Sequence, residues 1–318
     1  MAESTKTAII TGGLSGIGLG LARHLLSKAN WRVVIADVRP EAYTAISSTL
    51  DAEKHLFIPT NVVSWDNQAA LFKQAYDWSG GRIDFFAANA GIAEKDHITM
   101  GFLGQGWDLE AEPPKPDLLA LEVDEIAVFY GLRLFVHYAR KTKSALRASS
   151  TPFNPKVVMT ASTAGIYPFP LVPAYAAAKH AVVGLARSVG LPLMATDGIA
   201  VNCICPGYVD TGLTPNELTV LWPAGNITPI STLVRAYDEL ISDTGTVVQD
   251  GKSDGKDGQV KAGQSVECSV DRLFYRDPVP YPDESQKFLV EQSFLPDGVW
   301  ARGMAAALQN ARAAAAKA

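Results

Sequence analysis

Short apolar runs alternate with longer amphipathic stretches along most of this chain. Nearly continuous apolar runs are typical of strands that are buried on both faces of a parallel sheet. The alternation predicts helices that connect neighbouring parallel strands by right-handed crossovers. We therefore expect an α/β fold with a Rossmann-like, doubly wound parallel sheet. The expected strands are Thr7 to Thr11, Arg32 to Asp37, His55 to Thr60, Ile83 to Ala88, Lys156 to Ala161, Ile199 to Cys205 and Gln264 to Val270.

The amphipathic stretches between these runs are expected to form helices. Several of them have a proline near the start, where its fixed φ suits the first helical turn. Between two of the elements, Thr99 to Lys115 is rich in Gly, Pro and acidic residues, which predicts a long surface loop bordering a substrate site. The expected helices are Gly16 to Lys28, Pro40 to Leu50, Ser64 to Trp78, Pro116 to Lys143, Pro173 to Ala195 and Thr228 to Ser242.

The 318 residues are expected to form one domain with two embellishments. Residues 1–270 would hold the sheet and all the candidate site residues. Within them, Asp243 to Gly263 has almost no large apolar side chain after Val248, which predicts a flexible insertion. Residues 271–318 would form a C-terminal extension that ends in an alanine-rich run from Met304.

Composition excludes several other classes of protein. A net charge of −5, with acidic and basic residues mixed, gives no basic surface for nucleic acid. The polar start of the chain and the absence of a long apolar run predict a cytoplasmic protein that does not enter a membrane. Three cysteines and five histidines show no metal-ligand spacing, so we expect no metal and buried, unreactive thiols.

A glycine-rich turn follows the first expected strand and leads into the first helix, in the sequence Thr11-Gly-Gly-Leu-Ser-Gly-Ile-Gly18. Glycines at this place let backbone amides and the helix N-terminus approach a pyrophosphate. About twenty residues later, Asp37 ends the second strand, where a carboxylate can accept hydrogen bonds from the adenosine ribose. Its charge would repel a 2′-phosphate, and Ser15 rather than a basic residue precedes Gly16. The sequence thus predicts NAD as the preferred cofactor and NADP as the less favoured one, and Arg39 is the one residue that would favour NADP.

Tyr175 and Lys179 are four residues apart, and Ser162 lies thirteen positions before the tyrosine. The spacing of four places the phenol and the ammonium on one face of a helix, where the positive charge favours the phenolate. Tyr175 is then a candidate acid or base near neutral pH. Taken singly, Tyr175 could be a core aromatic, Lys179 a solvated helix residue and Ser162 a turn or capping residue. Their joint spacing favours catalysis.

These motifs, together with Ala88-Asn-Ala-Gly91 and Pro206-Gly207, resemble those of the short-chain dehydrogenases/reductases, in the right order over most of the chain. The stretch from Ser162 to Thr211 most resembles the 15-hydroxyprostaglandin dehydrogenase-like branch, and the long loop and C-terminal extension resemble fungal members. The resemblance implies that Tyr175 is the acid/base, Ser162 holds the substrate oxygen and Lys179 binds the nicotinamide ribose. The implied cofactor contacts are Gly12, Ser15, Gly16, Ile17, Gly18, Asp37, Asn61, Val62, Asn89, Ala90, Gly91, Tyr175, Lys179, Pro206, Gly207, Val209 and Thr211.

One position departs from the family pattern. The family usually carries an asparagine in the helix before the serine strand, where it bends the helix and anchors a water that links the lysine to solvent. Asp124 occupies that position here, and Glu125 follows it. A carboxylate can accept a hydrogen bond from water but cannot donate one unless protonated, and its charge would weaken the pull of Lys179 on the phenol. Asp124 is therefore a candidate catalytic residue with an open role in the proton relay.

The function expected from these residues is NAD(H)-dependent interconversion of a secondary alcohol and a ketone on a fairly apolar small molecule, in secondary metabolism. Trp107, Leu213, Leu221 and Trp222 are candidate pocket walls. Asp124 motivates an alternative, a non-redox isomerase or cyclase on the same fold, and a cofactor-binding regulator is a third reading. The resemblance implies a homodimer or homotetramer that forms through the helices expected at Pro116 to Lys143 and Pro173 to Ala195.

Overall fold

The computed structural model describes residues 5–95, 98, 110–148, 151–295 and 297–315. The chain forms two compact units, Met1–Arg276 and Asp277–Ala318. The first unit holds the sheet and all the candidate site residues. The elements found among the described residues of the second unit are helical.

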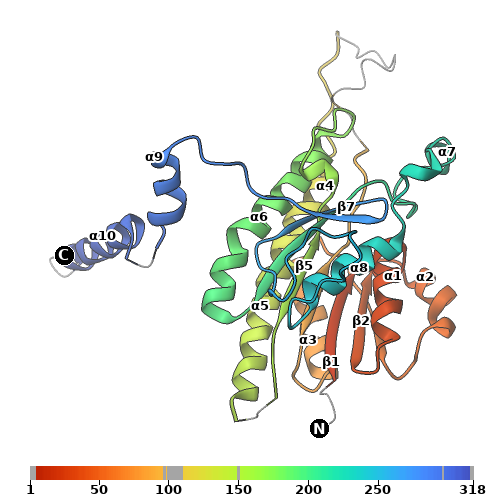
Figure 1. Ribbon diagram of the computed structural model, residues 1–318, viewed down its shortest axis with the longest axis horizontal. Helices are drawn as coiled ribbons and strands as arrows, with labels where there is room; N and C mark the ends of the chain where they lie inside the picture. The colour runs from red at the N-terminus through yellow and green to blue at the C-terminus, as the bar shows by residue number, and fades with distance from the viewer. Residues whose placement is uncertain (1–4, 96–97, 99–109, 149–150, 296, 316–318) are drawn as a thin grey trace. The chain divides into compact units, whose positions relative to one another are not determined.

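An eight-stranded sheet forms the centre of the first unit, in the order β3-β2-β1-β4-β5-β6-β7-β8 (Figure 1). The first seven strands in chain order are parallel, and β8 pairs antiparallel with β7 at the edge. The expected doubly wound sheet is confirmed, with this one antiparallel strand added. The strands are β1 Lys6–Thr11, β2 Trp31–Asp37, β3 His55–Pro59, β4 Phe85–Ala88, β5 Lys156–Thr160, β6 Ala200–Pro206, β7 Ser265–Ser269 and β8 Arg272–Tyr275.

The strand order reverses between β1 and β4, because β1 pairs with β2 on one side and with β4 on the other. In open α/β sheets, ligands bind at such a switch point, outside the carboxyl ends of the strands. Here β1 ends at Thr11 and β4 ends at Ala88, so the glycine-rich turn and the Asn89 to Gly91 segment leave the sheet side by side. The topology therefore places both motifs at one crevice.

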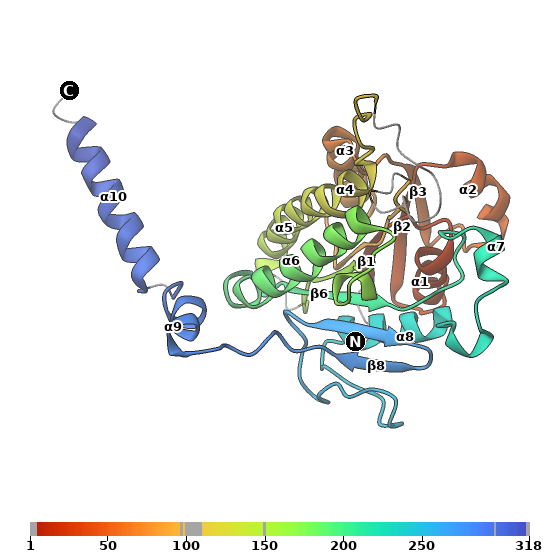
Figure 2. The ribbon, with the colours of Figure 1, turned by 90° about the horizontal axis from the view of Figure 1, so that it is seen from above.

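Helices cover both faces of the sheet (Figure 2). One core cluster joins α3, α5 and α6 to the sheet, and a second joins α1 and α8 to the opposite face. Helix α8 packs on the sheet through one apolar side, because its buried residues recur at helical spacing. These residues are Leu233, Ala236, Tyr237 and Leu240. The helices of this unit are α1 Gly16–Leu26, α2 Pro40–Ile46, α3 Trp65–Trp78, α4 Leu119–Leu121, α5 Ala127–Ala145, α6 Pro173–Asp197, α7 Asn216–Thr219 and α8 Ile230–Ile241.

The helix expected from Pro116 to Lys143 is interrupted. Helix α4 begins only at Leu119, and a π-helical turn, Glu122–Ile126, separates it from α5. A π-turn inserts an extra residue into the helical repeat and is frequent at functional sites. This one contains Asp124, so the carboxylate is placed by a local departure from α-helical geometry.

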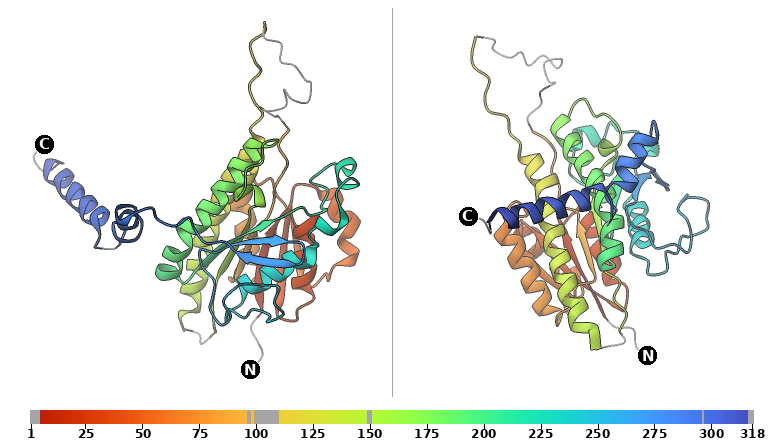
Figure 3. Two further views of the ribbon diagram at one scale, coloured as in Figure 1. Left: turned by 45° about the horizontal axis from the view of Figure 1, so that its top comes forward. Right: turned by 90° about the vertical axis from the view of Figure 1, so that its left-hand side faces the viewer.

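The insertion between α8 and β7, which can be followed in Figure 3, makes hydrogen bonds within itself and to β6. It has no helix or strand, as its composition indicates, but Lys261 is buried and donates to the carbonyl oxygens of Gly245 and Lys256. The side chain of Asn202 on β6 donates to the Lys261 carbonyl oxygen and accepts from the Gln264 amide. These contacts pair part of the insertion's polar backbone with the rest of the protein.

The first unit extends to Arg276, beyond the boundary at residue 270 that the sequence suggests, because β8 continues the sheet. The second unit contains α9 Glu284–Lys287, a π-turn Phe288–Gln292 and α10 Val299–Ala315, in which no residue is buried. Among the residues described, no helix combines the length and the apolar character that a membrane span requires.

Candidate active site

The glycine-rich turn has the geometry of a phosphate cradle. Gly12 and Gly16 have φ angles of +65° and +49°, in the left-handed region that favours glycine. At Gly18 a Cβ would collide with the carbonyl oxygen of Gly12 and would lie 2.7 Å from Asn89 Nδ2. The turn thus leads straight into the N-terminus of α1 with its backbone uncovered, which suits a pyrophosphate.

Asn89 ties three strands together below this turn. Its Nδ2 donates to the Thr11 carbonyl oxygen at 3.1 Å, and its Oδ1 accepts from Thr160 Oγ1 at 3.1 Å. The backbone amides of Asn89 and Ala90 both donate to Thr11 Oγ1. These bonds hold the ends of β1, β4 and β5 in register at the crevice.

Asp37 is nearly buried at the end of β2, and Arg39 closes over it. The Arg39 guanidinium donates to Asp37 at 3.1 Å through Nε and to Ser15 Oγ at 3.0 Å through Nη2. The Leu14 amide also donates to Asp37, at 3.3 Å. The hydrogen bond to Asp37 raises the pKa of Arg39, so the charged pair persists. The predicted ribose selector therefore shares its carboxylate with a cation that is about half exposed.

Lys179 and Tyr175 lie one turn apart on α6, as their spacing predicts. The Lys179 ammonium is 5.3 Å from the centre of the Tyr175 ring and donates to the Thr160 carbonyl oxygen at 3.0 Å. Burial lowers the pKa of Lys179, but Asp124 and Tyr175 oppose it and the net pKa is raised. Lys179 is thus a cation held against the end of β5, beside the phenol.

Asp124 is fully buried and pairs with Lys179. Its Oδ2 lies 3.3 Å from Lys179 Nζ, and its Oδ1 accepts from the Ile92 amide at 2.9 Å. Burial raises the pKa of Asp124, and Lys179 and Ile92 only partly offset this effect. A Cβ on Gly91 would lie 3.4 Å from both the Asp124 carboxylate and the Lys179 ammonium. The structure therefore joins α6, the π-turn and the segment after β4 at one buried ion pair.

Ser162 follows β5 and caps the short 3₁₀ turn Thr163–Gly165, where its Oγ accepts from the Ala164 amide at 3.1 Å. The hydroxyl proton remains available for another acceptor. Lys179 donates to the carbonyl oxygen of Thr160, which lies two residues before Ser162. Ser162 and Lys179 are therefore both placed at the carboxyl end of β5.

The segment after β6 approaches the glycine-rich turn. A Cβ on Gly16 would lie 2.7 Å from the Thr211 Cβ, and Val209 packs into the core cluster that also contacts Ile17. Pro206 ends β6, and the Gly207 amide donates to the Cys268 carbonyl oxygen. Two predicted adenine contacts, Asn61 and Val62, follow β3 in the loop before α3. Asn61 Oδ1 accepts from the Val63 amide, so that side chain shapes its own turn.

Apolar side chains surround the same end of the sheet in two groups. Tyr167, Phe169 and Leu171 are exposed on the connection between Ser162 and α6. Leu213, Leu221 and Trp222 are exposed on the connection that contains α7, and Trp222 stacks on Tyr208 at 4.0 Å. Trp107 and most of the loop from Thr99 to Lys115 lie outside the described residues.

Glu94 contacts the site, although nothing in the sequence pattern marked it. It is almost buried, and its Oε2 accepts from the Tyr175 amide at 3.0 Å. The sequence signal was weak, because the only hint is its position shortly after Asn89 to Gly91. A contact over 81 residues cannot be read from local spacing.

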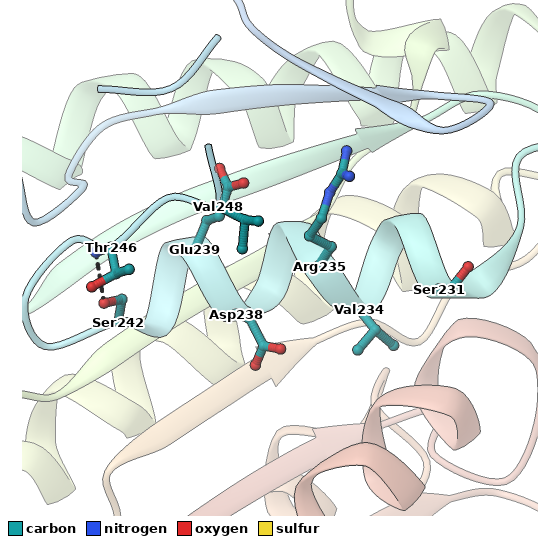
Figure 4. Close-up of a pocket in the computed structure, with 8 residues that line it drawn as sticks. All are labelled: Ser231, Val234, Arg235, Asp238, Glu239, Ser242, Thr246 and Val248. Carbon is teal, nitrogen blue, oxygen red and sulfur yellow. Dashed lines mark hydrogen bonds between the residues drawn. The ribbon is translucent and has the colours of Figure 1, made fainter. Parts of the chain in front are cut away.

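An open groove with a volume of about 320 Å³ lies elsewhere, along α8 (Figure 4). None of the predicted site residues lines it. Arg235 pairs there with Asp250, and Glu239 accepts from Ser253 and Tyr275. These polar groups hold the insertion against α8, so the groove has a structural explanation. Within the described residues no cluster of His, Cys, Asp or Glu could hold a metal ion, and the three cysteines are buried.

The chain is similar to several known proteins. A family model described as enoyl-(acyl carrier protein) reductase matches residues 12–219. The short-chain dehydrogenase/reductase prx6 of Penicillium rubens is 30% identical over 263 residues, covering 82% of this chain and 79% of that protein. The NADP-dependent dehydrogenase clz5 of Cochliobolus lunatus is 31% identical over 211 residues, covering 65% of this chain and 72% of that protein.

The fold has matches among solved structures as well. A 3-ketoacyl-(acyl-carrier-protein) reductase from Brucella melitensis, complexed with NADH, superposes with a TM-score of 0.64 at 20% identity, covering 85% of this chain and 98% of that one. The chain belongs to the short-chain dehydrogenase/reductase family, and its expected membership is confirmed. It is accordingly an oxidoreductase by family.

Proposed function

We propose that this protein interconverts a secondary alcohol and a ketone with a nicotinamide cofactor, and that Tyr175 is the acid/base. The observation that carries the proposal is the buried cluster in which Lys179 contacts Asp124, the Thr160 carbonyl oxygen and the face of Tyr175. It lies at the switch point of the sheet, beside a glycine cradle that added Cβ atoms would fill. These residues fit a dinucleotide.

The side chains have complementary roles in this reaction. The nicotinamide, when bound, supplies or accepts the hydride. In the reductive direction the Tyr175 hydroxyl gives its proton to the substrate oxygen, and the Ser162 hydroxyl donates a hydrogen bond to that same oxygen. The Lys179 ammonium stabilises the phenolate that remains, because an opposite charge nearby favours the ionised form. Asp124 in turn holds Lys179 in place.

We propose NAD as the preferred cofactor, with Asp37 as the selector. Its carboxylate is nearly buried at the end of β2 and can accept from ribose hydroxyls. Arg39 is the competing influence, because its guanidinium and Ser15 together could receive a 2′-phosphate. Relatives do not decide the matter, since one is named NADP-dependent and a structural neighbour holds NADH.

Calorimetric titration with NADH and NADPH tests this choice. The wild type should bind NADH more tightly, and Asp37→Ala should lose that preference. Arg39→Ala should weaken NADPH binding while leaving NADH binding within a few-fold. Tighter NADPH binding by the wild type would make Arg39 the selector and would refute the assignment.

An apolar substrate is supported by the two groups of exposed side chains that flank the site, around Tyr167 and around Trp222. Sites lined by apolar side chains favour apolar ligands with a small number of polar anchors. The reactive carbonyl or carbinol would be the polar part. A panel of cyclic and aromatic ketones is therefore the first substrate screen.

The test of the catalytic role compares Tyr175→Phe with Tyr138→Phe. Tyr138 is partly buried and packs against Phe72 and Tyr76 between α3 and α5, so its variant controls for the loss of a hydroxyl. Tyr175→Phe should abolish oxidation of the cofactor with any ketone that the wild type reduces, at nearly unchanged NADH affinity. Retained turnover in Tyr175→Phe would exclude Tyr175 as the acid/base.

We also propose a homo-oligomer. Four large apolar residues are exposed on the surface of the first unit: Ile126 at the end of the π-turn, Phe129 in the first turn of α5, and Leu191 and Met194 near the end of α6. Exposed apolar groups of this kind are frequent at subunit interfaces. Sedimentation should give a dimer or a tetramer, and Phe129→Lys should shift the equilibrium toward monomer. A wild-type monomer at micromolar concentration would contradict this.

A further inference from the structure

The helix that carries Tyr175 and Lys179 begins without a cap of its own. The N-cap residue of α6 is Val172, whose side chain cannot accept a hydrogen bond, and Pro173 follows it. The first amides of a helix have no partner inside the helix and need an acceptor from elsewhere. Tyr175 is the third residue of α6, so its amide is one of these.

Glu94 supplies the acceptor from a distant part of the chain. Its Oε2 accepts from the Tyr175 amide at 3.0 Å, and only 6% of Glu94 is exposed. A carboxylate at a helix N-terminus also interacts favourably with the helix dipole. A hydrogen bond to an ionised acceptor is stronger than a neutral one. The backbone of the catalytic tyrosine is thus fixed to the loop after β4.

The same loop contacts the rest of the buried cluster. The Ile92 amide donates to Asp124, and Gly91 packs against both Asp124 and Lys179. Four consecutive residues, Gly91 to Glu94, therefore meet α6 at two points and the π-turn at a third. The position of Tyr175 relative to Lys179 and Asp124 depends on how firmly this loop holds the start of α6.

We propose that Glu94 is a positioning residue for Tyr175, acting through the backbone of the first turn of α6. The inference rests on the proposed function, because it concerns the reaction that Tyr175 performs. An ordinary helix cap would affect stability alone. A positioning residue affects the chemical step, since small displacements of a catalytic group can slow a reaction by about 100-fold.

Three variants separate these roles. Glu94→Ala removes the acceptor, and Glu94→Gln keeps an oxygen at the same place without the charge. Asp283→Ala is the matched control, because Asp283 caps α9 in the second unit by accepting from the Gln286 amide at 2.9 Å. With a ketone that the wild type reduces, kcat of Glu94→Ala should fall by about 10- to 100-fold, with NADH affinity nearly unchanged. Glu94→Gln should recover most of kcat, and Asp283→Ala should match the wild type.

Hydrogen exchange gives a readout that does not depend on turnover. Amides in the first turn of α6 should exchange faster in Glu94→Ala than in the wild type, and Glu94→Gln should restore their protection. Wild-type kcat and protection in Glu94→Ala, or equal losses in both Glu94 variants, would overturn the inference. Altered exchange in a protein that reduces no ketone would instead mark the failure of the proposed function, with the structural contact intact.

Discussion

Removing Asp124 tests the buried ion pair most sharply. The carboxylate is fully buried, and its partner Lys179 has a side chain that is 4% exposed. Asp124→Ala would leave the Lys179 ammonium without its counter-charge and the Ile92 amide without its acceptor. Asp124→Asn would keep an acceptor oxygen for Ile92 and remove only the charge. The two variants therefore separate the loss of the group from the loss of its charge.

The expected costs follow from burial. Deleting one partner of a buried ion pair costs about 3–5 kcal/mol, because the remaining charge is desolvated and unpaired. For a domain of this size, each kcal/mol lowers Tm by about 2–4 °C, so Asp124→Ala should lower Tm by roughly 6–20 °C. Asp124→Asn also removes the counter-charge of Lys179, but it keeps an acceptor oxygen for the Ile92 amide, so it should cost less than Asp124→Ala.

The pH dependence has a definite sign. Because the folded-state pKa of Asp124 is raised above its ordinary value of 3.8, the folded protein binds this proton more tightly than the unfolded chain does. The wild type should therefore gain stability relative to Asp124→Asn as the pH falls through the raised pKa, and the gain should be complete below 3.8. This is the reverse of the usual behaviour of a salt-bridged carboxylate.

Calorimetric unfolding of the wild type and the two Asp124 variants across pH measures both effects. Asp77→Ala is the control, because Asp77 pairs with Lys73 on the surface, where both side chains are mostly exposed. An exposed pair contributes little, so Tm of that variant should be almost unchanged. If Asp124→Ala were as stable as Asp77→Ala, the reasoning about the buried pair would be refuted.

Three further predictions concern the cradle, the core and the surface. Gly18→Ala should abolish measurable NADH binding in calorimetry, since the added Cβ collides with the backbone of the turn, whereas unimpaired binding would contradict the cradle. Tyr237→Phe should lower the free energy of unfolding in urea by about 1 kcal/mol, because its buried hydroxyl bonds Thr160 at 2.9 Å, and no change would mean that this bond contributes nothing. Hydrogen bonding to Arg140 lowers the pKa of Asp197 to about 2, so its stabilisation is present above pH 3.8 and is lost as the pH falls through 2. An NMR titration should find this midpoint and its return toward 3.8 in Arg140→Ala, and an ordinary midpoint in the wild type would exclude the interaction.

The sheet could be predicted from the sequence because its strands are short apolar runs with burial on both faces. All six strands expected before residue 206, and the seventh at β7, are found within a few residues of their predicted bounds. The antiparallel β8 was missed, since Arg272–Tyr275 mixes polar and apolar residues at an edge. The contacts of the insertion could not be predicted either, because Asn202 and Lys261, which bond each other, are far apart in the sequence.

The candidate site, like the fold, could be predicted from the sequence only in part. The spacing of Tyr175 and Lys179 is local to one helix, so their shared face could be derived before the structure. The ion pair of Lys179 with Asp124 depends on a π-turn. The spacing of the apolar residues in the sequence does not predict the extra residue of that turn. The Arg39 clamp on Asp37 and the Glu94 cap on α6 are tertiary contacts of single side chains. Such contacts follow from the fold and cannot be read from spacing alone.

The central claim is hydride exchange between a nicotinamide and a carbonyl carbon, with a proton from Tyr175. The most direct measurement uses NADH deuterated at the transferring position of C4, together with a ketone that the protein reduces. We predict one deuterium at the carbinol carbon for each cofactor oxidised, and no such product from Tyr175→Phe. Product without deuterium, formed with no change in nicotinamide absorbance, would contradict the redox assignment and favour an isomerase or cyclase on this fold.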